Sequence, residues 1–146
     1  MAKIRHIALA TKDPETTADF FKTAFEFKEV GRMGDPVGKP EGSHGIFLSD
    51  GTLNLAVLKF GWDQIGKGLD YVGLHHFGVL VDDVDQWTEK LEGAGADCFA
   101  RRPEVNTNTF YEVKFRGPEG LVFDISENPW LGSEPLNKAD AREQKA

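Results

Sequence analysis

The chain contains the same short pattern twice, 70 residues apart, and this internal repeat limits the folds that it can adopt. Residues 4–13 and 74–83 are each a run rich in Ile, Leu and Val that carries a histidine and ends on an aspartate. His6 corresponds to His76 and Asp13 corresponds to Asp83, so the histidines and the aspartates share one offset. Self-similarity at a fixed spacing indicates two copies of one structural unit.

Each of these aspartates is followed by a segment with helical patterning. Asp13 is suited to cap a helix, because its carboxylate accepts hydrogen bonds from the free N–H groups of the first turn, and Pro14 follows where no donor is needed. Asp83 precedes Gln86 by three residues, as in a capping box. The apolar positions of the two helices are Phe20, Phe21, Ala24 and Phe25, and Val84, Trp87, Leu91 and Ala94. We therefore expect one amphipathic helix in each copy.

Three strand-like runs separated by glycine follow each helix. They cover residues 27–32, 45–49 and 52–60 in the first copy and 97–101, 109–116 and 121–126 in the second. Asp50-Gly51 and the segment 117–120 have the composition of turns between antiparallel strands. These patterns predict an α+β fold of two βαβββ modules, at about 3–60 and 72–130. We expect a surface loop at 33–44 and a mobile polar tail at 131–146.

Composition excludes several classes of function. A chain of 146 residues with 40% hydrophobic and 28% charged residues has the size and composition of one globular domain. Its net charge of -7 leaves no basic surface for nucleic acid. The single cysteine, Cys98, rules out a disulfide framework, and we find neither a signal peptide nor an apolar stretch that could span a membrane. We expect a cytoplasmic protein that binds small molecules.

Strand alternation places four polar residues on one face of the predicted sheets. In the opening strands, His6 and His76 alternate with side chains that face the helices, so both histidines point away from the helices. In the closing strands, the same alternation puts Asn54 and Asp124 on that face, whereas His75 is expected on the other. If the two sheets pack side by side and curve, the four side chains converge. Two imidazoles and a carboxylate form a ligand set that suits Fe(II), Mn(II), Ni(II) or Zn(II).

The repeated motifs resemble a known superfamily. The strands His-Ile-Ala-Leu-Ala and His-Phe-Gly-Val-Leu-Val, each followed by Asp and a helix, and the closing Gly-Pro-Glu-Gly-Leu-Val-Phe-Asp-Ile are similar to the vicinal oxygen chelate superfamily. That group includes glyoxalase I, methylmalonyl-CoA epimerase, extradiol dioxygenases, and the fosfomycin and bleomycin resistance proteins. The resemblance implies an open, cup-like mixed sheet around a divalent metal ion, which binds the substrate through two adjacent oxygen atoms.

The resemblance also assigns roles by position. It makes His6, His76 and Asp124 the expected metal ligands, although the superfamily usually has Glu in place of Asp124. Asn54 falls in the fourth-ligand slot, where glyoxalases and epimerases have the Glu or Gln that moves the proton. An amide cannot serve as a general base, because it has no accessible pKa near neutrality. This difference argues against a standard glyoxalase I or epimerase mechanism.

The function that we infer from the sequence is a metal-dependent enzyme of the glyoxalase and dioxygenase class, with two alternatives. The ligand count matches the facial triad of Fe(II) oxygenases, which favours an extradiol-type dioxygenase over a lyase or epimerase. Its acid or base group could come from His44, Tyr71 or Tyr111. The alternative from another class is a binding protein of the bleomycin-resistance type, without catalysis. We also expect a homodimer, since Phe20 beside Phe21 makes the apolar helix stripe wider than one core contact needs.

Overall fold

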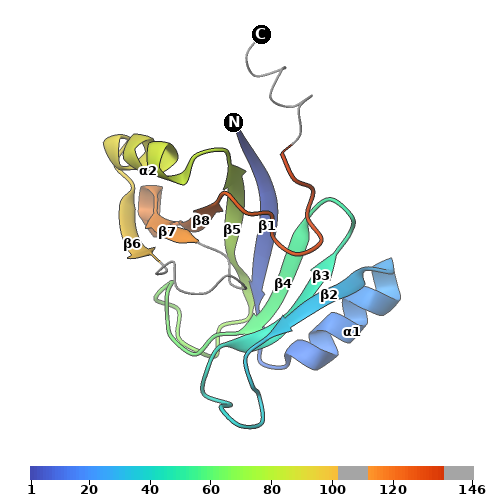
Figure 1. The fold of residues 1–146 in the computed structure, drawn as a ribbon. Coiled ribbons are helices and arrows are strands. Elements are labelled where there is room, and N and C mark those ends of the chain that lie inside the picture. The colour runs from blue at the N-terminus through green and yellow to red at the C-terminus, as the bar shows by residue number, and fades with distance from the viewer. Residues whose placement is uncertain (102–111, 137–146) are drawn as a thin grey trace.

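The computed structural model describes residues 1–101 and 112–136 (Figure 1). The first module consists of β1 (Ala2–Ala10), α1 (Pro14–Phe25), β2 (Lys28–Met33), β3 (His44–Ser49) and β4 (Asn54–Lys59). The second consists of β5 (Gly73–Val81), α2 (Val84–Gly93), β6 (Asp97–Arg101), β7 (Val113–Arg116), the short 3-10 helix η1 (Pro118–Gly120) and β8 (Val122–Ser126). The predicted α+β class, with the βαβββ pattern in both copies, is confirmed.

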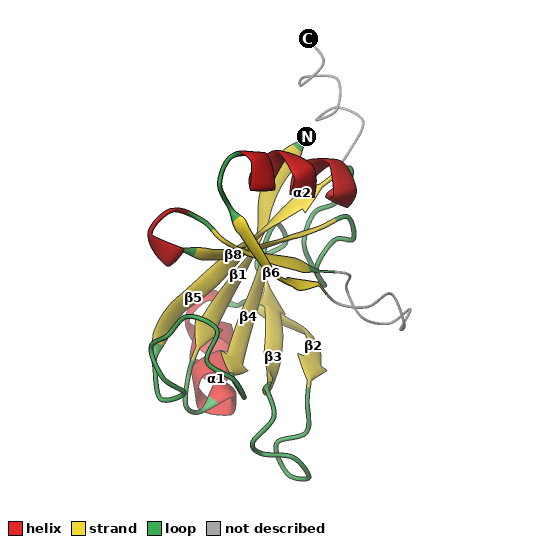
Figure 2. Ribbon diagram, turned by 90° about the vertical axis from the view of Figure 1, so that its left-hand side faces the viewer, coloured by secondary structure: helices red, strands yellow, loops and turns green. Residues whose placement is uncertain are grey.

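The strands of the two modules form one mixed sheet of eight strands in the order β2-β3-β4-β1-β5-β8-β7-β6. β1 and β5 pair antiparallel at its centre, and each pairs in parallel with the closing strand of its own module, β4 or β8. The sheet is strongly curved, with the two helices at its opposite ends (Figures 1 and 2). This order brings the opening and closing strands of both modules together in the middle of the sheet.

Both helices begin at the predicted aspartates. The Asp13 carboxylate accepts a hydrogen bond from the Thr16 backbone N–H at 3.1 Å, and Asp83 accepts one from Gln86 at 3.0 Å. These caps satisfy first-turn N–H groups that have no partner within the helix. Neither helix of the described chain combines the length and the apolar character that a membrane crossing requires.

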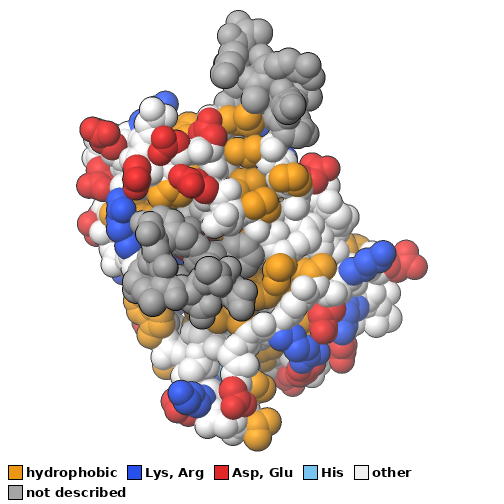
Figure 3. Space-filling model, in the orientation of Figure 1, with side chains coloured by type: hydrophobic (Ala, Val, Ile, Leu, Met, Phe, Trp, Pro, Cys, Tyr) orange, Lys and Arg blue, Asp and Glu red, His pale blue; other side chains and the backbone are white. Residues whose placement is uncertain are grey.

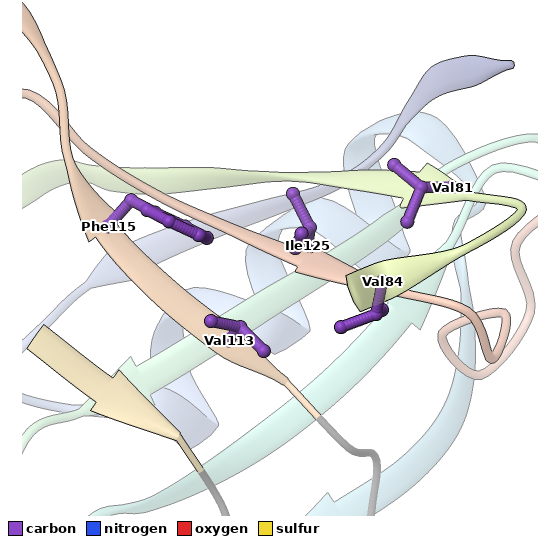
Figure 4. Packing of buried hydrophobic residues seen from close by; sticks show 5 residues of the cluster. All are labelled: Val81, Val84, Val113, Phe115 and Ile125. Carbon is purple, nitrogen blue, oxygen red and sulfur yellow. The ribbon is translucent and has the colours of Figure 1, made fainter. Parts of the chain in front are cut away.

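Each helix covers a separate apolar core on the outer face of the sheet. Under α1, Ala18 packs with Ile46, Leu48 and Val57. In the second module the buried cluster is Val81, Val84, Val113, Phe115 and Ile125 (Figure 4). The apolar strand residues of the second core alternate with polar ones such as Lys114 and Asp124, so these polar side chains lie on the opposite face of the sheet.

The beginning of the expected C-terminal tail is part of the folded structure. The Ser49 hydroxyl donates to the Gly132 carbonyl at 2.7 Å, and the Glu134 backbone N–H donates to the Thr52 carbonyl at 3.0 Å. Residues 131–134 of the expected mobile tail are thus hydrogen-bonded to Ser49 and Thr52, and residues 137–146 of it lie outside the described residues. These contacts are made largely by backbone groups, which any residue type supplies, so composition did not indicate them.

Candidate metal centre

Three of the predicted ligands meet in the middle of the sheet. His6 of β1, His76 of β5 and Asp124 of β8 each offer one ligand atom, and these atoms lie within 4.8 Å of one another. The Nε2 atoms of the two histidines are 3.3 Å apart, and His76 Nε2 lies 3.2 Å from Asp124 Oδ2. The three residues are 4%, 8% and 0% exposed, so the cluster is shielded from bulk water.

Asn54 lies behind His6 and contacts the nitrogen that faces away from the cluster. Its Oδ1 is 2.8 Å from His6 Nδ1, while its Nδ2 donates to the Leu131 carbonyl at 2.9 Å. Because the amide nitrogen is used by Leu131, the amide oxygen must accept from His6 Nδ1–H, which leaves a lone pair on His6 Nε2. Asn54 thus orients a ligand instead of lying among the ligand atoms. Trp130 stacks on the same imidazole at a centroid distance of 4.9 Å.

His75 is the residue whose predicted direction was wrong. In the pairing of β5 with β1, His76 is opposite Ala8 and Leu74 is opposite Leu9, so His75 is an extra residue in a β-bulge. A bulge interrupts the strict alternation of side chains and can turn two neighbours toward one face. His75 is buried, and its Nδ1 lies 2.7 Å from His76 Nδ1.

Two charged residues of the site were missed by the analysis of the sequence. Lys114 of β7 is paired with Asp124 of β8, and its Nζ donates to Asp124 Oδ2 at 3.1 Å. Glu112 lies 3.7 Å from Lys114 Nζ through Oε2 and accepts at Oε1 from Trp130 Nε1 at 3.0 Å. The sequence alternates Val113 and Phe115 with these two charged residues. Because the apolar pair faces the core under the helix, this alternation could have predicted that Glu112 and Lys114 lie on the same face as the metal ligands.

The protonation of the cluster follows from burial and neighbouring charge. Burial alone would raise the pKa of the Asp124 carboxyl, but the positive charge of Lys114 and the hydrogen bond from His76 outweigh it and hold that pKa below its ordinary value. Burial is also the largest effect on His6 and lowers the pKa of its imidazole, which favours the neutral ring. At neutral pH the cluster therefore presents an ionised carboxylate beside a neutral imidazole.

This donor set fits a divalent transition metal. Metal ligation requires a deprotonated carboxylate and imidazole nitrogens with free lone pairs, and the hydrogen bond to Asn54 leaves His6 Nε2 in that form. Asp124 Oδ1 is buried and has no hydrogen-bond partner among the described residues, so the carboxylate keeps unused acceptor capacity. His6, His76 and Asp124 are therefore the residues that would hold the ion.

A cleft of about 640 Å³ opens onto the cluster. Its polar lining includes His6, His76, Glu112 and Lys114, and its aromatic walls include Phe47, Phe60, Trp62 and Trp130. Arg32 and Arg101 also line it, and each is paired with carboxylates: Arg32 with Glu15 and Glu29, and Arg101 with Asp85. Figure 3 shows apolar side chains over the strands between the helices, whereas acidic side chains gather over α2.

The remaining catalytic candidates lie elsewhere. The His44 Nδ1 lies 3.0 Å from the Gly42 carbonyl, and the residue lines a separate hollow beside the start of α1. The Tyr71 hydroxyl donates to the Leu74 carbonyl at 2.9 Å. Neither residue lines the cleft. Tyr111 lies outside the described residues.

Acidification is expected to destabilise the metal-free protein. Burial lowers the pKa of His6, and burial, together with the neighbouring His76 and Lys114, lowers that of His75 to about 3. The unfolded chain, with histidine pKa values near 6.5, therefore binds more protons than the folded chain below that pH. Stability present above pH 6.5 is lost as the pH falls toward 3, by at most about 1.4 kcal/mol per pH unit for each such histidine.

Denaturant titrations of the metal-free protein between about pH 7 and pH 4.5 measure this slope. The His75→Asn variant is the matched control and should show a shallower dependence of the unfolding free energy on pH. Equal slopes for the two proteins would show that His75 titrates alike in the folded and unfolded chains.

The fold and the site together define the class of the protein: a duplicated, curved sheet whose central strands present two histidines and a carboxylate to a cleft. The chain belongs to the Glyoxalase/Bleomycin resistance protein/Dioxygenase superfamily, which it matches over residues 3–125. This is the vicinal oxygen chelate superfamily that the repeated motifs predicted. No curated protein sequence matched the chain.

Solved structures share the fold at low sequence identity. A hypothetical protein from Bacillus halodurans is 17% identical, with a TM-score of 0.69 over 93% of this chain and 99% of that one. A Streptomyces coelicolor methylmalonyl-CoA epimerase bound to 2-nitronate-propionyl-CoA is 18% identical, with a TM-score of 0.70 over 91% and 98%. The Mycobacterium tuberculosis methylmalonyl-CoA epimerase is 14% identical, with a TM-score of 0.64 over 94% and 91%. The preference for a dioxygenase gains no support from these relatives.

Proposed function

We propose that this protein is a metal-dependent isomerase or lyase of the epimerase type, which moves a proton at a carbon atom next to a carbonyl group. One observation carries the proposal: Glu112 and Lys114 line the same cleft as the candidate metal ligands. A reaction of this kind needs an acid or base within reach of the substrate. The amide at Asn54 argued against such a reaction, and Glu112, the residue just before β7, supplies a carboxylate instead.

Different residues of the site have different roles in this proposal: three bind the metal ion, and Glu112 and Lys114 act on the substrate. When bound by His6, His76 and Asp124, a divalent metal ion supplies a Lewis acid for two neighbouring oxygen atoms of the substrate. Glu112 accepts the proton from the substrate carbon, and the hydrogen bond from Trp130 Nε1 fixes the direction of its carboxylate. Lys114 contributes a positive charge next to the oxygen on which negative charge develops.

The structural relatives suggest which substrates to test first. Several are methylmalonyl-CoA epimerases, and one of these structures contains methylmalonyl-CoA. The mixed lining of the cleft, with charged groups at the cluster and aromatic walls beside it, suits a substrate that combines a carboxylate or thioester with an apolar portion. These features support small acyl thioesters with an acidic C–H bond as the substrate class.

Proton exchange at carbon is the direct test. Metal-loaded protein in D2O is expected to replace the acidic C–H proton of methylmalonyl-CoA, or of the hemithioacetal of methylglyoxal and glutathione, as followed by proton NMR. The Glu112→Gln variant should lose about 10²- to 10⁴-fold in exchange rate at unchanged metal content. Glu89→Gln, at an exposed position of α2, is the matched control and should exchange like the unmodified protein.

Two outcomes would contradict the proposal. Full exchange by Glu112→Gln would show that another group moves the proton. Failure of the metal-loaded protein to exchange either substrate, together with oxygen uptake and ring cleavage when catechols are added to the Fe(II) form, would establish the dioxygenase alternative.

A further inference from the structure

His75 makes an unusual contact with a candidate metal ligand. Its Nδ1 lies 2.7 Å from His76 Nδ1, and both imidazoles are buried. A hydrogen bond between two ring nitrogens requires one proton between them, and either neutral ring can donate it. The contact is therefore compatible with both tautomers of His76, provided that His75 adopts the complementary one.

The contact of His6 Nδ1 with Asn54, in contrast, is compatible with only one tautomer of His6. Asn54 donates through its amide nitrogen to the Leu131 carbonyl, so only its oxygen faces His6 Nδ1. His6 is thereby held in the tautomer that leaves Nε2 unprotonated. The two histidines of the cluster thus have partners of different kinds: one partner only accepts, whereas the other can donate or accept.

His76 needs a different tautomer with and without a bound metal ion, because its Nε2 faces the Asp124 carboxylate. Its Nε2 lies 3.2 Å from Asp124 Oδ2 and 3.3 Å from His6 Nε2, so a proton on Nε2 has an acceptor while Nδ1 accepts from His75. If Nε2 is to bind a metal ion, that proton must leave, and the ring then carries its proton on Nδ1. The buried Nδ1 keeps a hydrogen bond only if its partner changes from donor to acceptor.

We propose that His75 is a positioning residue that keeps His76 hydrogen-bonded in both tautomers, so that His76 Nε2 can change from donor to metal ligand. The inference rests on the proposed metal site. The protons balance: His76 releases its Nε2 proton to solvent through the cleft that it lines, the proton between the two Nδ1 atoms moves from His75 to His76, and His75 takes up one proton from solvent on Nε2. The change moves protons between the nitrogens of the two rings and leaves the number of protons on each ring the same.

The surroundings of His75 hold its ring in the required place. The β-bulge turns the side chain toward His76, and the Phe60 ring stacks on it at a centroid distance of 3.7 Å and an interplanar angle of 7°. His75 also lines a crevice of about 10 Å³, room for roughly one water molecule, with Thr11 and Tyr71 among its neighbours. A proton exchanged with solvent thus has a short route to the ring.

Nitrogen-15 NMR of the imidazoles reads the tautomers directly, with no activity assay. In metal-free protein we expect protons on His75 Nδ1 and His76 Nε2, and in the Zn(II) form on His75 Nε2 and His76 Nδ1. A His75 tautomer that is the same in both forms would overturn the proposal, as would failure of the protein to bind Zn(II). Tautomers that reverse in a protein without proton exchange at carbon would leave this inference intact and remove only the proposed function.

Two variants separate hydrogen bonding from packing. His75→Phe keeps a flat ring against Phe60 but removes the nitrogen, and its Zn(II) affinity, measured by competition with a chelator, should fall about 10- to 100-fold. His75→Asn restores a group that can donate or accept near the position of Nδ1, and should recover most of that affinity. Equal affinities for the unmodified protein and His75→Phe would show that His75 only fills space.

Discussion

Protein with alanine in place of both His6 and His76 is expected to retain no divalent metal, whereas the unmodified chain should take up close to one equivalent. The double replacement leaves Asp124 as the single ligand of the cluster, and one carboxylate does not hold a transition metal ion in competition with water. Elemental mass spectrometry of protein purified without chelator measures the content. Metal at about 100 times its Kd should stabilise only the unmodified protein, by about 2.7 kcal/mol.

The control for this pair is His44→Ala, which removes a histidine that lies outside the cleft and should leave the metal content unchanged. Circular dichroism of the double variant shows whether it keeps its fold. Metal retained by the double variant would refute the ligand assignment. Absence of metal from the unmodified protein, even after anaerobic reconstitution, would favour the alternative of a non-catalytic binding protein.

Gly78→Ala is expected to damage the site almost as severely without changing a ligand. Gly78 lies opposite His6 on β1 and opposite Asp124 on β8, and a Cβ atom there would approach Asp124 Oδ1 to 2.5 Å and His6 Cδ2 to 2.8 Å. It would also lie 2.7 Å from Trp130 Cζ2. Overpacking of this kind costs about 1 to 3 kcal/mol and forces the ligands apart. Denaturant unfolding and chelator competition should both show the loss.

Gly93→Ala provides the comparison, because a Cβ atom at that position of α2 meets no atom within 4 Å. Alanine is the better helix former, so this variant should be as stable as the unmodified protein or more stable. If Gly78→Ala bound Zn(II) with unchanged affinity, the centre of the sheet would have room that the structure does not indicate.

Much of the fold could be predicted because each module is specified by local signals. Asp13 and Asp83 cap the helices through hydrogen bonds to the residues three positions later in the chain. Because the partners are so close in sequence, a short sequence motif is enough to predict the start of each helix. The alternation along the closing strand distinguished Asp124 from Ile125, which faces the helix core. The repeat then related the second module to the first.

The parts of the site that could not be predicted depend on contacts between distant segments. The direction of His75 depends on a bulge in the pairing of β5 with β1, and no residue type is unique to such a bulge. Lys114 becomes a neighbour of Asp124 only because β7 and β8 align them in one register. The partner of the Asn54 amide nitrogen is a backbone carbonyl, that of Leu131, which any residue could supply.

The line where the two modules meet passes through the candidate metal centre. His6 belongs to the first module and His76 and Asp124 to the second, and β1 and β5, which carry the histidines, are the strands that join the modules. Neither copy of the duplicated unit therefore has a complete set of ligands. A bound ion would cross-link the two modules, and loss of the histidine of either module would leave the ligands of the other module without a complete metal site.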